Sequence, residues 1–171
     1  MSDAATRADP PNRWPWPPII FAGAAAAAFL LGRFSPWPDA SWATPGLRLF
    51  GYALFAAGLT LDGAAMLTMR RCRANILPHR SATALVTSGP FALSRNPIYL
   101  GNTVALMAAA AAFGNAWFLP AALGAAKLVS LLAIRREEAH LAALFGPAWS
   151  TYAQRTSRWL RVGAARVTMR H

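Results

Sequence analysis

The sequence predicts an all-α integral membrane protein with about four transmembrane helices and a cytosolic, interfacial C-terminal helix. Hydrophobic residues make up 56% of the 171 residues and charged residues only 13%, whereas a soluble domain carries about 25% charged residues. Four long apolar segments also lie along the chain. Alanine is abundant in all four, and small side chains let helices approach closely in lipid. We therefore expect a compact bundle of membrane-spanning helices.

The four apolar segments differ in length. A spanning helix needs about 20 residues, with a range of roughly 17 to 25. The second and fourth segments meet this requirement, the first is marginal, and the third is short unless Pro97 begins it. The segments cover residues 17–34, 47–69, 98–113 and 115–134. After the fourth, Leu141, Leu144 and Phe145 recur at helical spacing, which predicts an amphipathic helix at the membrane surface.

No linker or separate soluble domain is visible, so we expect one membrane domain over residues 1–171. An N-terminal span and its flanks occupy 1–46, and a core occupies 47–171. The first segment has some features of a signal peptide, but Asp3 and Asp9 dilute the basic leader and prolines crowd residues 10–18. A retained span is therefore favoured over a cleaved leader.

The basic residues indicate the orientation. The net charge is +11, and Lys127 is the single lysine among 17 basic residues. Arginines concentrate in the 70–95 loop and in the tail after residue 134, while the connection around Asn115 has none. Because cytosolic loops carry the excess of arginine and lysine, we expect both termini and the 70–95 loop in the cytosol. The tryptophans at the segment ends fit aromatic belts at the two membrane surfaces; they are Trp14, Trp16, Trp37, Trp42 and Trp117.

The composition also limits the partners and the compartment. A basic tail on so hydrophobic a chain is better explained by anionic lipid than by nucleic acid. The excess of alanine and arginine suggests a high-GC coding bias, so we expect the inner membrane of a bacterium. The single cysteine, Cys72, excludes an internal disulfide, and no His or Cys spacing predicts a metal site.

The stretch GPFALSRNPIYLG, residues 89–101, places polar residues at the edge of an apolar segment. Asn96 suits the N-cap and Pro97 the first position of a helix. The free N–H groups of a helix N-terminus favour an anion. Arg95 lies beside this terminus, Tyr99 stands just inside it, and Gly101 opens space one turn further on. The stretch therefore predicts a cradle for a polar cofactor at the membrane boundary.

A second polar cluster, RREE, follows the fourth segment. Arg135 and Arg136 alone are explained by the positive-inside rule, but the carboxylates of Glu137 and Glu138 at a membrane edge are harder to explain in that way. Arg135 and Glu138 share a helix face at a spacing of three residues. Because the third and fourth segments form a hairpin, we expect the two polar clusters to converge on one cytosolic pocket.

These residues carry a resemblance to a known family. LVTSGPFALSRNPIYLG and REEAHLAALFGPAWSTYAQRTSRWL resemble the isoprenylcysteine carboxyl methyltransferase and phospholipid methyltransferase group, whose pattern is LVTxGPYxxxRHPxYxG and then EExxLxxxFGxxYxxY. The resemblance covers residues 70–160. It implies an integral membrane enzyme that uses S-adenosylmethionine.

The resemblance also implies site residues. Arg135, Arg136 and Glu138 are expected to act in catalysis or on the substrate. The expected cofactor-binding positions are Thr83, Ala84, Leu85, Val86, Phe91, Arg95, Asn96, Pro97, Ile98, Tyr99, Glu137 and Glu138. Three positions depart from the family pattern: Asn96 replaces a histidine, Phe91 replaces a tyrosine, and Thr83 stands where some members have histidine. A titrating base is lost at Asn96, and a loop histidine, His79, is a weak substitute.

The expected reaction is methyl transfer to a lipophilic acceptor, either a carboxylate, as in the isoprenylcysteine enzymes, or a phospholipid amine. The arginines favour an anionic or soft acceptor over a protonated amine. A reductase of the sterol-reductase kind that uses NADPH and a non-enzymatic scaffold are the alternatives. Two charged residues within spans, Asp62 and Lys127, are further functional candidates. Asp62 could face the pocket, and Lys127 could either snorkel to the membrane surface or pair with Asp62.

Overall fold

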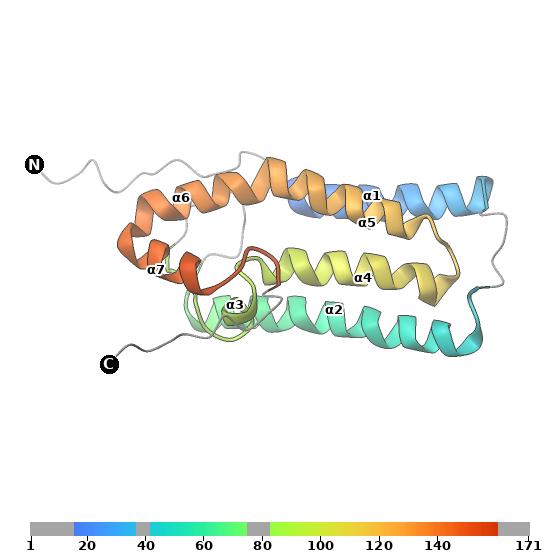
Figure 1. Ribbon diagram of the computed structural model, residues 1–171, viewed down its shortest axis with the longest axis horizontal. Coiled ribbons are helices and arrows are strands. Elements are labelled where there is room, and N and C mark those ends of the chain that lie inside the picture. Colours follow the sequence, from blue (N-terminus) through green and yellow to red (C-terminus); the bar gives the residue numbers. More distant parts are fainter. Residues whose placement is uncertain (1–15, 37–41, 75–82, 161–171) are drawn as a thin grey trace, which may run out of the picture.

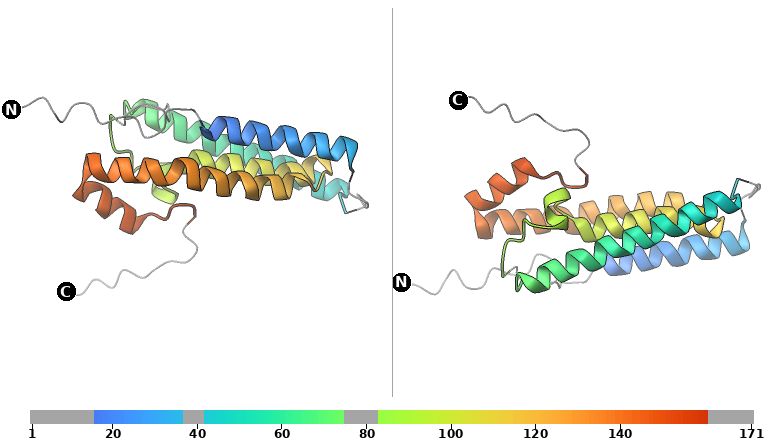
Figure 2. Two further views of the ribbon diagram at one scale, coloured as in Figure 1. Left: turned by 90° about the horizontal axis from the view of Figure 1, so that it is seen from above. Right: turned by 90° about the horizontal axis from the view of Figure 1, so that it is seen from below.

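The computed structural model describes residues 16–36, 42–74 and 83–160, and the regular elements in these ranges are all helical. Four long rods run side by side, with α4 between α2 and α5 and with α1 behind α5 in the view of Figure 1. The views from above and below show the same side-by-side arrangement of the four rods (Figure 2). The elements are α1 Trp16–Phe34, α2 Pro45–Arg71, α3 Pro90–Leu93, α4 Pro97–Phe113, α5 Phe118–Val129, the π-helical η1 Ser130–Ile134, α6 Arg135–Phe145 and α7 Pro147–Arg155.

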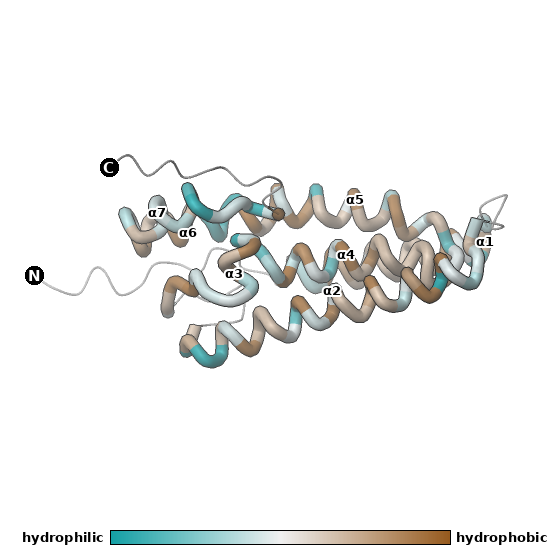
Figure 3. The backbone as a smooth tube through the Cα atoms, turned by 60° about the horizontal axis from the view of Figure 1, so that its bottom comes forward, coloured by the Kyte–Doolittle hydropathy of each residue, from teal (hydrophilic) through white to brown (hydrophobic). Residues whose placement is uncertain are grey.

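Three of the described helices are long and apolar enough to cross a membrane, namely Pro17–Phe34, Pro45–Arg71 and Phe118–Phe145. The fourth apolar helix, α4, has 17 residues and a length of about 26 Å. This helix corresponds to the third apolar segment of the sequence, and it begins at Pro97, the start that the segment needs to approach the length of a membrane span. Hydrophobic residues dominate the shared length of the four rods, and hydrophilic residues gather at the end that carries α6 and α7 (Figure 3). The chain is an integral membrane protein.

The shortest of these helices lies inside the bundle. α4 packs between α2 and α5 and also touches α1. Its buried residues are mostly alanines, and Ala108, Ala109 and Ala112 are at most 3% exposed. By contrast, α1 and α2 expose many large apolar side chains, which suits helices that face lipid. The abundance of alanine therefore reflects a central helix with close neighbours on several sides.

The contact between α2 and α4 depends on glycine. A Cβ on Gly58 would lie 2.7 Å from the carbonyl oxygen of Gly101, and a Cβ on Gly101 would lie 2.0 Å from Oδ1 of Asp62. The space beside Gly101 is thus filled by α2 and does not open toward a cofactor. Asp62 is buried, and its Oδ1 has no hydrogen-bond partner. Lys127 is exposed, and its helix α5 does not pack against α2. Of the two alternatives for Lys127, pairing with Asp62 is therefore excluded.

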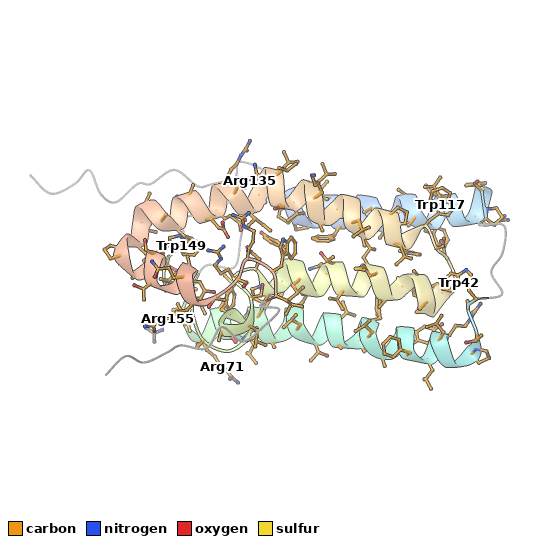
Figure 4. The ribbon with its side chains drawn as sticks, viewed as in Figure 1. Trp42, Arg71, Trp117, Arg135, Trp149 and Arg155 are labelled. Carbon is orange, nitrogen blue, oxygen red and sulfur yellow. The ribbon has the colours of Figure 1, made fainter. Side chains whose placement is uncertain are left out.

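The opposite end of the bundle is closed by the hairpin between α4 and α5. Gly114 ends α4 in the left-handed region at φ 65°. Nδ2 of Asn115 donates to the carbonyl of Ala28 in α1 at 2.9 Å, and Nε1 of Trp117 donates to the carbonyl of Ser35 at 2.8 Å. Trp42 and Trp117 lie together at this end (Figure 4), as an aromatic belt requires. Trp14 and Trp37 lie outside the described residues.

The helix formed by the fourth apolar segment continues beyond the last hydrophobic residue of that segment. α5 continues through the π-helical turn η1 into α6 without a break. The chain then reverses at Gly146, whose φ of 49° lies in the left-handed region, and α7 follows. α6 and α7 therefore project from the end of the bundle opposite the hairpin (Figure 1), and the predicted C-terminal helix is present as two short helices.

Candidate functional site

Two segments that are about forty residues apart in the sequence meet at the end of the bundle that carries α6 and α7. The hydroxyl of Tyr99 donates to Oε1 of Glu137 at 2.8 Å. Nη2 of Arg95 lies 3.2 Å from Oε1 of Glu138, and these two side chains are only 15% and 13% exposed. Burial strengthens such charge-assisted contacts because little water competes for them. The predicted convergence of the two polar clusters is therefore present in the structure.

Glu138 has a second cationic partner, Arg158. Nε of Arg158 lies 3.1 Å from each carboxylate oxygen of Glu138, and Nη2 also donates to Oε2. These hydrogen bonds raise the pKa of the Arg158 guanidinium above its ordinary value. The carboxylate is thus shared by two guanidinium groups, one beside the start of α4 and one beyond α7. We call Arg95, Tyr99, Glu137, Glu138 and Arg158 the carboxylate cluster.

The backbone around Arg158 is tied to the segment before α4. Nδ2 of Asn96 and Oγ of Ser94 both donate to the carbonyl of Arg158, at 3.0 and 3.1 Å. The amide of Arg95 donates to the carbonyl of Ser157 at 2.9 Å. Asn96 does stand at the N-cap position, but its side chain makes no capping hydrogen bond. The expectation that Asn96 caps α4 with its side chain is therefore wrong, because this amide is used to hold the C-terminal segment.

α7 supports the cluster from the other side. The guanidinium carbon of Arg95 lies 5.7 Å from the centre of the Trp149 ring, which is a cation–π distance. The hydroxyl of Tyr152 donates to the carbonyl of Phe91 at 2.7 Å. Burial raises the pKa of Tyr152 to about 12, with Arg95 lowering it and Glu138 raising it further. Tyr152 is therefore a neutral hydrogen-bond donor at physiological pH.

The remaining expected cofactor positions differ in their exposure. Gly89 makes the turn before α3 at φ 59°, in the left-handed region that favours glycine. Val86 and Pro97 are buried, and Phe91 and Ile98 are half-buried. Ala84 and Leu85 are also half-buried, whereas Thr83 is exposed and donates to the carbonyl of Arg73 at 3.0 Å. His79 lies outside the described residues.

The structure does not bring Arg135 and Arg136 into the cluster. Both side chains are exposed, and Arg135 points away from Trp149 and α7 (Figure 4). Glu138 is paired with Arg95 and Arg158 and not with Arg135. Arg135 and Arg136 therefore lie at the surface of α6 and outside the carboxylate cluster.

Comparison with known proteins identifies the family. A family model described as phospholipid methyltransferase matches residues 47–148, which run from α2 to the first turn of α7. The chain belongs to the phospholipid methyltransferase family. This confirms the resemblance carried by the GPF, RNPIY and REE motifs. The match begins after α1, and it ends before Trp149, Tyr152 and Arg158.

The chain is also 30% identical over 128 residues to a nickel-cobalt-cadmium resistance protein, NccN, from Alcaligenes xylosoxydans xylosoxydans. The aligned part is 74% of this chain and 55% of NccN, so the chain spans about half the length of that relative. Among the described residues, no group of three His, Cys, Asp or Glu side chains is placed to hold a metal ion. No solved structure matches the chain.

Sequence reasoning missed Arg158 of the carboxylate cluster and the two aromatic residues of α7 that lie beside the cluster. Trp149 and Tyr152 occupy the two aromatic positions of the family's FGxxYxxY pattern, and this pattern was the available signal for them. Arg158 was counted only as one of the basic residues of a lipid-facing tail. Nothing in its spacing marks it, because its contacts with Glu138 and the 94–96 segment depend on the chain reversal at Gly146.

Proposed function

We propose that this member of the phospholipid methyltransferase family is an integral membrane enzyme that transfers a methyl group from S-adenosylmethionine to a lipophilic acceptor. The observation that supports the proposal best is the carboxylate cluster. It joins an aromatic hydroxyl, two carboxylates and two guanidinium groups where the apolar helices end. A scaffold without activity would have no need for paired carboxylates at a membrane edge, where each unpaired charge is costly.

Two features of the site fit the anionic end of S-adenosylmethionine. Nε of Arg95 is buried and has no hydrogen-bond partner. The first turn of α4 has no side-chain cap, so its leading N–H groups are directed at whatever lies beside Asn96. A carboxylate placed there would be held by both features. The positive sulfur of the cofactor would be favoured by the Glu137 carboxylate and by the face of Tyr99.

When bound, S-adenosylmethionine would supply an electrophilic methyl group on a positively charged sulfur. The protein's own contribution is then placement, and a well-oriented pair of reactants gains about 7–11 kcal/mol over free reactants. The hydrogen bond from Tyr99 to Glu137 fixes both side chains. A cation–π contact with Trp149 and an ion pair with Glu138 fix the guanidinium of Arg95. Together these contacts give the site a rigid frame before any ligand arrives.

The acceptor is proposed to enter from the membrane. The cluster lies where the apolar part of the bundle meets its hydrophilic end (Figure 3), so an acceptor can keep its tail in lipid while its head group reaches the cluster. The exposed Arg135 and Arg136 would attract an anionic head group and repel an ammonium group. We therefore place an anionic or soft acceptor first. It is a carboxylate, as in the isoprenylcysteine enzymes, or a thiol. The family description favours the second candidate, a phospholipid amine.

The decisive experiment combines cofactor binding with product identification. Purified protein in detergent is incubated with methyl-labelled S-adenosylmethionine and a lipid extract of the host, and labelled products are identified by mass spectrometry. Parallel reactions contain a prenylated thio-acid or phosphatidylethanolamine. Labelled acid or thiol supports the first candidate, and labelled phosphatidylethanolamine alone supports the second. A folded protein that binds NADPH and not S-adenosylmethionine would refute the methyltransferase and favour a reductase.

A further inference from the structure

The two helices that carry the carboxylate cluster do not pack against each other. No Cα atom of α4 lies within 8 Å of a Cα atom of α6. The side chains of Tyr99 and Arg95 nevertheless bridge the gap and contact Glu137 and Glu138 on α6. α6 continues α5, which packs against α4, so this packing places the start of α6. Beyond η1, the distance between α4 and α6 is set by the side-chain contacts and by the segment after α7.

Arg158 contacts both arms at once. Its guanidinium holds both oxygens of Glu138 on α6. Its carbonyl accepts hydrogen bonds from Ser94 and Asn96, which precede α4. Each of these donors is a buried polar residue, so each hydrogen bond replaces water that the group cannot otherwise reach. Among the described residues that contact Glu138, Arg158 is the one that fixes the start of α4 through its backbone and α6 through its side chain.

The chemistry of Glu138 makes this contact strong. The carboxylate is 13% exposed and accepts from two guanidinium groups. The planar fork of arginine matches both carboxylate oxygens, a geometry that the single ammonium group of lysine cannot reproduce. If the guanidinium of Arg158 is lost, Glu138 keeps only its contact with Arg95. Two side-chain contacts, Tyr99 with Glu137 and Arg95 with Glu138, then hold α6 to the start of α4. The distance between the two helices and the rotation of α6 about its axis are less restricted.

We infer that Arg158 is a positioning residue that acts through Glu138 to set the distance between the start of α4, which carries Tyr99, and the start of α6, which carries Glu137. Its catalytic consequence rests on the proposed methyltransferase function, but its structural consequence does not. The Arg158 side chain is 37% exposed, so water weakens its contact with Glu138, and loss of the guanidinium is expected to weaken cofactor affinity by about tenfold.

The first test measures the geometry without any ligand. Spin labels are attached to the variants Leu93→Cys and Ala139→Cys, two exposed positions on α3 and α6, in a Cys72→Ser background, and their separation is measured by pulsed electron resonance. The Arg158→Gln variant is expected to broaden the distance distribution, and Arg158→Lys to broaden it less. The control, Arg71→Gln, removes the same charge from an exposed position at the end of α2 and is expected to leave it narrow. An unchanged, narrow distribution in Arg158→Gln overturns the inference.

The second test measures the consequence for the site. The affinity for S-adenosylmethionine is determined for Arg158→Gln, Glu138→Gln and the double variant. Because the two residues act as one unit, the double variant is expected to be no weaker than the weaker single variant. Fully additive losses, or an Arg158→Gln variant that binds as tightly as Arg71→Gln, would contradict the positioning role. If the unaltered protein binds no S-adenosylmethionine, the proposed function fails, and the distance measurement still decides the role of Arg158.

Discussion

Replacing Gly101 by alanine is expected to push α2 and α4 apart. The added Cβ would lie 2.0 Å from Oδ1 of Asp62 and 2.6 Å from the carbonyl oxygen of Gly58. Rotation of the Asp62 side chain can relieve the first contact. The second is with the backbone of α2, so the two helices have to separate by several tenths of an ångström or more. Overpacking of this kind costs about 1–3 kcal/mol.

Gly63 supplies the matched control, because it lies in the same helix as Gly58 and a Cβ on it would have no neighbour within 4 Å. Alanine is favoured over glycine in a helix interior by about 1 kcal/mol, and Gly63→Ala gains this without any clash. Gly101→Ala gains a similar amount, so the difference in unfolding free energy between the two variants isolates the helix–helix contact. We expect Gly101→Ala to be less stable than Gly63→Ala by about 1–3 kcal/mol.

The difference is measured by reversible unfolding in mixed detergent micelles, followed by tryptophan fluorescence. The functional counterpart is the affinity for S-adenosylmethionine, since Tyr99 lies two residues before Gly101 and moves with α4. We expect Gly63→Ala to keep the affinity and Gly101→Ala to lose part of it. A Gly101→Ala protein as stable as Gly63→Ala would show that the close approach of α2 and α4 does not hold in the membrane protein.

Three further predictions concern the site and the topology. Tyr99→Phe removes the donor to Glu137 and should weaken binding of S-adenosylmethionine by about tenfold or more, as measured by equilibrium binding; parent-like affinity in a folded variant would remove Tyr99 from the site. Arg135→Gln and Arg136→Gln should each raise the acceptor KM and leave the cofactor affinity unchanged, in line with their exposed positions; a loss confined to cofactor binding would contradict this. Reporter fusions at Asn115 and at the C-terminus should report the periplasm and the cytosol respectively, and a periplasmic C-terminus would overturn the proposed orientation.

Local sequence signals predicted the elements of the site well. Pro97 marked the start of α4. The absence of charge around Asn115 indicated the hairpin that returns the chain, and the hairpin in turn brought Tyr99 and Glu137 to the same end. Each of these inferences uses backbone preferences or short-range connectivity, and these are properties that a few neighbouring residues determine.

The directions of individual side chains were harder to predict. Asn96 has the right residue type for a cap, yet its amide is directed at the carbonyl of Arg158, a partner that is 62 residues away. The position of Arg158 depends on the reversal at Gly146 and on the docking of α7. Likewise, Gly101 indicates a close approach, but the sequence does not say whether a ligand or another helix occupies the space. Such outcomes are decided by tertiary packing and not by local pattern.

The π-helical turn η1 makes the site sensitive to chain length. A π-turn holds about one residue more than an α-turn, and each residue of an α-helix advances the helix by about 100°. If Ser130–Ile134 closed to regular α-helical turns with all its residues kept, α6 would turn by about that angle. Glu137 and Glu138 would both remain in the chain, but they would no longer face Tyr99 and Arg95. In this part of the protein, the match between the width of the helical turn and the number of residues in it constrains the geometry of the candidate site as firmly as the identity of the carboxylates does.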